Sequence, residues 1–108
     1  MTANEVITYV DAMMENQIKP AVKLMWINQI ESEIQVRVLQ KPLEEMIRYT
    51  AEDMDTPLIA PRPFDQLYQE YLFWQICQTQ QEIQLADHYW KIFQRMYYEY
   101  VRHICETE

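Results

Sequence analysis

The chain contains no glycine among its 108 residues, and this absence limits its fold more than any other feature. Glycine is the residue that adopts positive φ angles most readily and lets a backbone approach a phosphate closely. Hairpin turns and phosphate-binding loops are therefore disfavoured. The nucleophile elbow, the Walker loop and the dinucleotide-binding fingerprint all need glycine, so we expect no enzyme of those classes.

The composition indicates a folded chain with one core. Hydrophobic residues make up 49% of the sequence and aromatic residues 13%, enough apolar surface to offset chain entropy. A chain of this length has room for a single hydrophobic core. We therefore predict one all-α domain over residues 1–108, a small bundle of about four to five helices.

The charge and the thiols indicate where such a protein works. The net charge of −8 would repel nucleic acid and anionic lipid. No apolar run approaches the roughly 20 residues needed to span a bilayer, and the N-terminus lacks the basic and apolar regions of a signal peptide. We expect an intracellular protein without a membrane partner, in which Cys77 and Cys105 are free, partly buried thiols.

The first 40 residues predict two helices. Thr2 and Glu5 have the spacing of a capping box, which starts a helix that we expect to end near residue 14. Pro20 suits the first turn of a second helix, over residues 20–39. Its predicted inner row is Leu24, Ile27, Ile30, Ile34 and Val38, with Trp26 beside it, and its predicted solvent side holds Asn28, Glu31 and Gln35.

The middle of the chain is interrupted by prolines. Pro42 interrupts the helical pattern or begins a new helix after it. We expect a short helix over residues 43–49 with Met46 and Ile47 facing inward. Residues 50–63 contain three prolines and read as the one substantial non-helical stretch. Prolines on either side favour an extended path through Leu58 and Ile59. These two apolar side chains need a partner surface, and we predict that they dock into a neighbouring molecule.

The rest of the chain, from residue 64 onward, predicts an antiparallel helical hairpin. One uninterrupted helix of this length would extend far beyond so small a domain, and Thr79 to Glu82 offers a second capping box. We therefore expect helices over residues 64–78 and 80–104. The predicted seam of the last helix is Ile83, Ala86, Trp90, Phe93, Tyr97, Tyr100 and Ile104, and its partner row is Phe64, Leu67, Tyr71 and Trp74.

No pattern in the sequence predicts a catalytic, metal or cofactor site. Glu99 and His103 are four residues apart and could place two metal ligands on one helical face, but two ligands do not make a metal site. His88 lies on another turn of the same helix. The carboxylate pairs Glu31/Glu33, Glu44/Glu45 and Asp53/Asp55 are interpreted as solvated surface. We expect no enzyme activity, no metal and no cofactor.

The aromatic residues of the last helix are too many for one buried face. Aromatic side chains outside a core are enriched at protein interfaces. Tyr89 and Tyr98 are therefore predicted contact residues. Base stacking would need a basic groove as well, and Lys91, Arg95 and Arg102 are too few for that.

Four stretches of the chain belong together as a pattern that covers most of it. They are residues 4–11 (NEVITYVD), 26–31 (WINQIE), 55–65 (DTPLIAPRPFD) and 67–72 (LYQEYL), with Glu82, Tyr89 and Phe93 in the last helix. With these stretches the chain resembles the head-tail connector or head-completion adaptor proteins of tailed phages, small helical proteins beneath the portal. This sequence differs from similar proteins at Gln81, where a small or glycine-like residue is common, and at Asp87 and His88, where an Asn near the tyrosine is common.

The resemblance implies a structural virion protein of a tailed phage or prophage. Such a protein would form a ring of about twelve subunits between the portal protein and the next neck or tail-completion protein. DNA would pass through the ring without specific binding, and the protein would move from the host cytoplasm to the virion neck. The candidate subunit or portal interface is Asp55, Leu58, Ile59, Arg62, Tyr89, Tyr98 and Arg102.

A second hypothesis is a small acidic helical regulator or inhibitor that binds a host protein. It predicts carboxylates in a stripe at phosphate-like spacing. The carboxylates are scattered along the sequence instead, and the conspicuous loop is apolar, which favours assembly.

Overall fold

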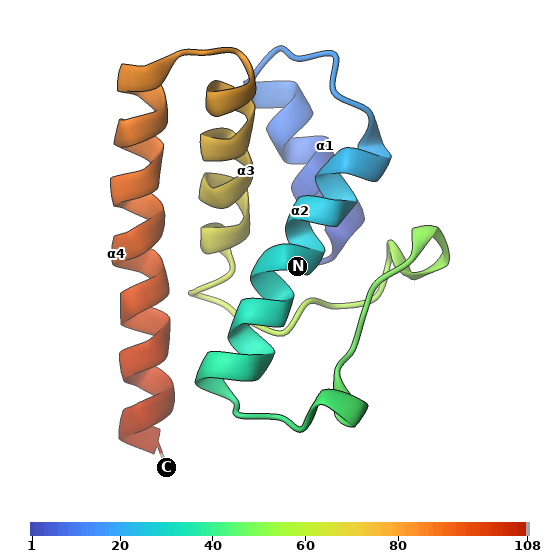
Figure 1. Ribbon diagram of the computed structural model, residues 1–108, viewed down its shortest axis with the longest axis vertical. Coiled ribbons are helices and arrows are strands. Elements are labelled where there is room, and N and C mark those ends of the chain that lie inside the picture. Colours follow the sequence, from blue (N-terminus) through green and yellow to red (C-terminus); the bar gives the residue numbers. More distant parts are fainter. Residues whose placement is uncertain (108) are drawn as a thin grey trace.

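Helices form most of the chain in a computed structural model that describes residues 1–107 (Figure 1). The α-helices are α1 (Ala3–Met13), α2 (Pro20–Glu33), α3 (Gln66–Thr79) and α4 (Ile83–Thr107). No β-strand forms within these residues, so the prediction of a small all-α bundle is confirmed. We call residues 39–65, the long connection that leads to α3, the strap.

The start of α1 follows the predicted capping box. The backbone N–H of Glu5 donates to Oγ1 of Thr2 at 3.2 Å, and the carboxylate of Glu5 accepts from the N–H of Thr2 at 3.0 Å. Two backbone donors that helix geometry leaves unpaired are thereby satisfied. The apolar face of α1 is buried through Val6, Ile7 and Val10.

The second helix begins at Pro20 as predicted and continues past Glu33 into a π-helix, Ile34–Val38. Its apolar row is buried at Leu24, Ile27, Ile30 and Ile34, and Val38 packs against it. The π-helix ends where Gln40 takes a φ of 53°, in the left-handed region that glycine would favour. In a chain without glycine, glutamine takes that position.

The predicted helix over residues 43–49 is wrong. Only a 3-10 turn, Leu43–Glu45, forms there, and Met46 already has the extended dihedral angles φ −66° and ψ 131°. Ile47 is 46% exposed rather than inward. The cause lies on α2 and the π-helix that continues it, whose side chains bind the backbone of residues 47 and 49, as described below. The non-helical stretch therefore begins earlier than residue 50, although a second 3-10 turn, Ala51–Asp53, lies within it.

The predicted hairpin of the last two helices is confirmed, but the break between them differs from the prediction. Thr79 is the last residue of α3, and its hydroxyl donates to the carbonyl of Gln75 at 2.9 Å. Gln81 takes a φ of 61°, and the N–H of Glu82 donates to the carbonyl of Cys77 at 2.9 Å. This is the bonding of a Schellman motif. The sequence that suggested a helix start therefore closes the preceding helix.

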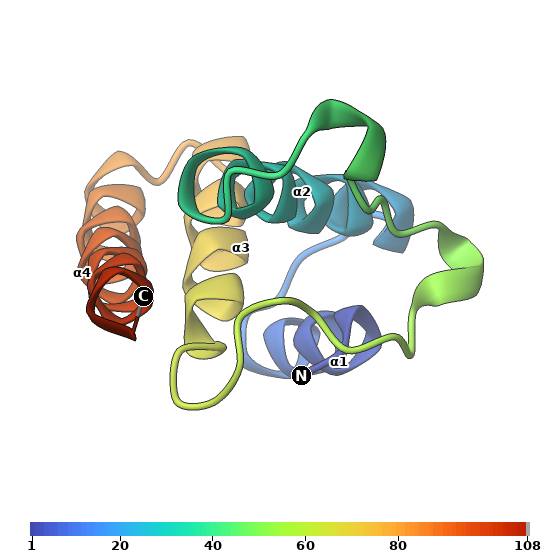
Figure 2. The same ribbon diagram turned by 90° about the horizontal axis from the view of Figure 1, so that it is seen from below.

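Aromatic pairs join α3 and the end of the strap to α4 along the predicted seam. Their ring centroids lie 5.6 Å apart for Phe64 and Tyr100, 5.1 Å for Tyr71 and Phe93, and 4.3 Å for Trp74 and Trp90. The seam is wrong only at Ile83, which is 80% exposed because it begins α4 beyond the end of α3. Figure 2 shows α4 on one side of α3, with α1 and α2 on the other.

The buried apolar residues of all four helices and of the strap form one cluster, as the prediction of a single core requires. Three charged side chains are buried as well, those of Lys23, Glu31 and Asp65. The ammonium of Lys23 donates to Asp11 at 2.6 Å and to the carbonyl of Ile18 at 2.8 Å, which ties α2 to α1.

Cys77 and Cys105 are free thiols, the first buried and the second exposed.

The aromatic seam predicts how mutations in α4 affect stability. Phe93→Ala should lower the free energy of unfolding by about 3–5 kcal/mol, because it leaves a cavity between α3 and α4. Tyr98→Ala, five residues along the same helix at a side chain 65% exposed, should change it by less than about 1 kcal/mol. Urea unfolding followed by circular dichroism measures both. Equal losses in the two variants would contradict the packing of α4 described here.

Candidate functional site

Three polar residues of α2 and its π-helical extension, Asn28, Glu31 and Gln35, face the strap. We call them the polar seam. Their spacing of three and four residues puts them on one helical face, and the prediction that this face is solvated is wrong. Glu31 and Gln35 are fully buried and Asn28 is partly buried. The strap covers them, as Figure 1 shows for its passage beside α2.

The two amides of the polar seam bind the strap as a neighbouring strand would. Asn28 donates to the carbonyl of Tyr49 and accepts from its N–H, both at 2.8 Å. Gln35 makes the same pair with Ile47, donating at 2.9 Å and accepting at 2.7 Å. Each amide carries one donor group and one acceptor that match a backbone unit. Residues 46–50 are therefore held extended against α2 and cannot continue the helix predicted there.

Glu31 lies at the centre of the seam and collects three donors. Its Oε2 accepts from the hydroxyl of Tyr49 and from the backbone N–H of Ile59, both at 3.0 Å. Its Oε1 accepts from the hydroxyl of Tyr68 on α3, which in turn accepts from the N–H of Ala60 at 2.8 Å. One carboxylate therefore joins α2, two parts of the strap and α3.

The electrostatics of Glu31 reflect a balance between burial and hydrogen bonding. Burial raises the pKa of its carboxyl group above the ordinary value, while the bonds from Tyr68, Ile59 and Tyr49 act in the opposite direction. Burial and the neighbouring carboxylate also raise the pKa of both tyrosines. Because the chain itself encloses Glu31, this group holds the strap rather than presenting a carboxylate to a substrate. The interpretation of Glu31/Glu33 as solvated surface is wrong for Glu31.

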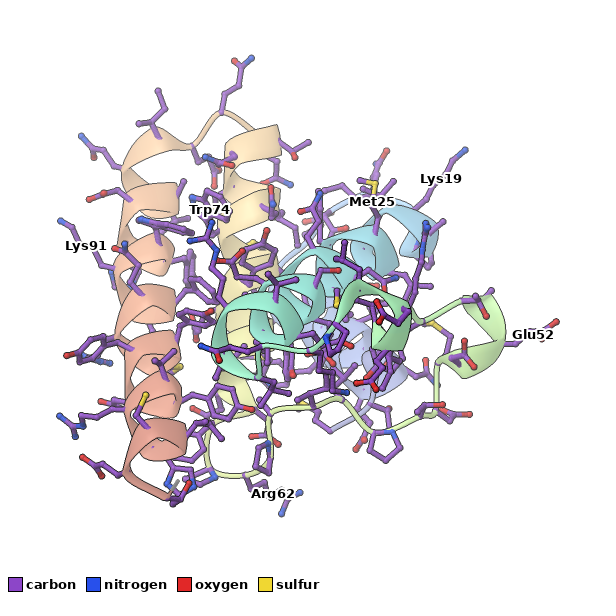
Figure 3. The ribbon with its side chains drawn as sticks, turned by 60° about the horizontal axis from the view of Figure 1, so that its bottom comes forward. Lys19, Met25, Glu52, Arg62, Trp74 and Lys91 are labelled. Carbon is purple, nitrogen blue, oxygen red and sulfur yellow. The ribbon has the colours of Figure 1, made fainter. Side chains whose placement is uncertain are left out.

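A groove on the surface is the second candidate site. It has a volume of about 950 Å³, and its floor and walls come from three helices. Figure 3 shows Trp74, one of its residues, between α3 and α4. We call it the aromatic groove. It is lined by Gln29, Ile30 and Glu33 of α2, Tyr71 and Trp74 of α3, and Trp90, Phe93, Gln94, Arg95, Tyr97 and Tyr98 of α4.

The predicted interface residues do not form one site. Tyr98 lines the aromatic groove, and Arg102 lies one turn further along α4, paired with Glu106 at 3.7 Å. Tyr89 is partly buried against Phe73, with ring centroids 5.1 Å apart. Asp55 and Arg62 lie on the strap, where Asp55 accepts from Asn4 at 3.3 Å and Arg62 is 92% exposed.

Leu58 and Ile59 have their partner surface within their own chain. Leu58 is 6% exposed and belongs to the core, so the prediction that it docks into a neighbouring molecule is wrong. Ile59 packs against the same core, and its N–H is bound by Glu31. Both follow the extended path that the prolines predict. The strap is therefore a part of the fold at this point and not a free plug.

The polar seam and most of the aromatic groove were not predicted from the sequence. The spacing of Asn28, Glu31 and Gln35 was visible, but it equally fits a solvated face, and no local signal shows that a strap crosses it. Trp74 and Trp90 are only partly buried, but their helical spacing also fits a fully buried row, so the sequence does not show that they line a groove.

Within residues 1–107 of the chain, no three His, Cys, Asp or Glu side chains gather closely enough to hold a metal ion. None of the helices in this range combines the length and the apolar character needed to cross a membrane.

The contribution of Glu31 to stability can be tested against its neighbour on the same helix. Glu31→Gln should lower the free energy of unfolding by about 1–3 kcal/mol, because an amide N–H₂ then faces donors and leaves one of them unpaired. Glu33→Gln should cost less than about 1 kcal/mol, since it removes only an exposed pair with Arg37. Chemical unfolding of both variants provides the measurement, and an unchanged Glu31→Gln protein would refute the role given to Glu31.

The pKa of Glu31 provides a second test. The folded-state pKa is raised above the unfolded one, so the folded state binds more protons between the two values and stability falls as the pH rises through that window. Tyr68→Phe removes a donor to the carboxylate and should raise the pKa further, by more than Tyr49→Phe does. Carbon-detected NMR titration of the Glu31 carboxyl measures this, with Tyr98→Phe as the unaffected control. A lower pKa in Tyr68→Phe would contradict the arrangement.

The chain was compared with protein-family models, with curated proteins and with solved structures, and none of them matches it. The functional proposal therefore depends on the polar seam, the aromatic groove and the residues that carry the resemblance to phage connectors.

Proposed function

We propose that this protein is a structural adaptor of a tailed phage or prophage, which joins the portal of the DNA-filled head to the tail by assembling with itself and with the portal protein. The observation that carries the proposal is the aromatic groove. Three helices build it, and the core of the chain leaves it open.

The groove has the chemistry of a protein-binding surface. Tryptophan and tyrosine are enriched at protein interfaces, where they provide large apolar contacts with a polar group at one end. Here Trp74, Trp90 and Tyr97 are partly buried, and Tyr98 is exposed. A groove between helices is also the usual receptor for an amphipathic segment of another protein. A partner that fills it would cover apolar surface that the isolated chain leaves in water.

The residues that carry the resemblance to connectors also contact one another. Glu31, Ile59 and Tyr68 come from three of the matching stretches and meet in one set of hydrogen bonds. Asn4 and Asp55, from the remaining stretch and the loop, are bonded to each other. A resemblance spread over residues that hold one fold together is more specific than one spread over unrelated positions. This supports membership of the connector class.

The charge suits a protein beside a DNA channel. With a net charge of −8, the protein would repel the phosphate backbone, so a passing genome would not adhere. The acidic regulator remains the alternative from another class. Because the groove is aromatic, its lining favours a protein partner over mimicry of phosphates.

The proposal predicts binding to the portal protein encoded in the same genome. Mixed with that purified portal, the protein should co-sediment and add a ring of density at one end of the portal in negative-stain images. Tyr98→Ala should weaken assembly on the portal about tenfold or more, whether the groove holds a neighbouring subunit of the ring or the portal itself, as expected of an aromatic anchor in a groove. Leu85→Ala, also exposed on α4 but outside the groove, should bind as the wild type does.

Absence of binding between the unaltered protein and portal would refute the adaptor function. Equal binding by Tyr98→Ala and wild type would leave the adaptor function in place and remove the groove from it. A host enzyme captured in a one-to-one complex, without portal binding, would favour the regulator.

A further inference from the structure

One face of α4 gathers cations in a chain that is otherwise acidic. Lys91, Arg95, Tyr98 and Arg102 follow one another at steps of four, three and four residues, which puts them in one stripe along the helix. All four are exposed. The three cations are a third of the nine in the chain, and α4 as a whole is neutral while the chain carries −8. We call these four residues the basic stripe.

The basic stripe adjoins the aromatic groove. Arg95 and Tyr98 belong to both, so an apolar segment in the groove would bring its neighbouring residues to the cations. Lys91 and Arg102 have partners one turn away on α4, Asp87 at 3.0 Å and Glu106 at 3.7 Å. Such exposed pairs are weak and exchange readily for a better-placed carboxylate.

The strap carries the complementary charge. Residues 44–55 contain five carboxylates, Glu44, Glu45, Glu52, Asp53 and Asp55, against the single cation Arg48. The same part of the strap offers exposed apolar side chains, since Leu43 is 79% exposed and Ile47 is 46% exposed. Leu43 directly precedes Glu44 and Glu45, so an apolar side chain and two carboxylates are presented together on one 3-10 turn.

The two surfaces lie apart within one molecule. Figures 1 and 2 both show α4 at one side of the molecule, the Leu43–Glu45 turn separated from it by the π-helical end of α2, and the Ala51–Asp53 turn at the opposite side. Figure 3 likewise places Lys91 and Glu52 at opposite edges, each pointing away from the body. Complementary surfaces on opposite sides of one chain can pair only between molecules.

We propose that the aromatic groove and basic stripe of one molecule bind residues 43–55 of a second copy. Leu43 enters the groove, and the carboxylates of Glu44 and Glu45 pair with Arg95 and Arg102. The contact joins two different surfaces, so copies associate head to tail, which gives a ring if the rotation closes and a filament if it does not. This inference deepens the proposed function and rests on it for the closure into a ring.

Sedimentation velocity at low ionic strength tests the contact with charge reversals. The wild type should sediment faster as its concentration rises, and added salt should weaken this association because salt screens exposed charges. The double variants Arg95→Glu/Arg102→Glu and Glu44→Lys/Glu45→Lys should each lower the association constant at least tenfold. A mixture of the two should associate again, because each new surface then meets an opposite charge.

A matched control separates this contact from net charge. Gln17→Glu/Lys19→Glu/Gln84→Glu changes the charge by the same amount as the α4 variant, at exposed residues outside both surfaces, and Figure 3 shows Lys19 far from α4. It should associate as the wild type does once the change in overall charge is screened with moderate salt. Leu43→Ser should weaken association, and Met25→Ser, at another exposed apolar residue, should not.

A wild type that stays monomeric at every concentration, or a mixture that fails to associate, would overturn the head-to-tail contact. So would a loss of DNA binding, rather than of self-association, in the α4 variant, since the stripe would then be a phosphate site. Portal binding is measured separately on the same variants. If every variant binds portal like the wild type and associates like it, the contact is wrong and the adaptor function stands.

Discussion

The structure depends on the hydrogen bonds of one buried carboxylate. Glu31 accepts hydrogen bonds from Tyr49 and Ile59, in two parts of the strap, and from Tyr68 on α3. A buried charge without partners would cost several kcal/mol, whereas a carboxylate with three donors is nearly satisfied. Asn28 and Gln35 extend the same principle along α2 by binding the strap backbone. A strap without an α-helix of its own thereby becomes a fixed part of the fold.

The sequence predicted what depends on local patterns. The capping box at Thr2, the start of α2 at Pro20 and the aromatic seam of α3 and α4 follow from short spacings and are present. The polar seam could not be predicted, because its burial depends on contacts with residues 12 to 37 positions away. The prediction of a second capping box is wrong for a similar reason. Residues 79–82 fit a helix start and a helix end, and only the packing of the hairpin decides between them.

The residues of the candidate site were likewise predicted only in part. Tyr98 was predicted as a contact residue because α4 has more aromatic side chains than one face can bury, and it does line the aromatic groove. Leu58 was placed at an interface because its surroundings in sequence are polar, but the strap turns it into the core. An apolar residue in a polar segment needs a partner surface, and sequence alone does not say whether that surface belongs to the same molecule.

Native-state hydrogen exchange measured by NMR tests the central claim most directly. If the polar seam fixes the strap, the amides of Ile47, Tyr49, Ile59 and Ala60 should be protected nearly as strongly as those of α3, because each is bonded to a buried or partly buried group. The amide of Arg48, between two of them, should exchange quickly. Rapid exchange at all four amides alongside protected helices would show that the strap opens independently, and would contradict the role given to Glu31.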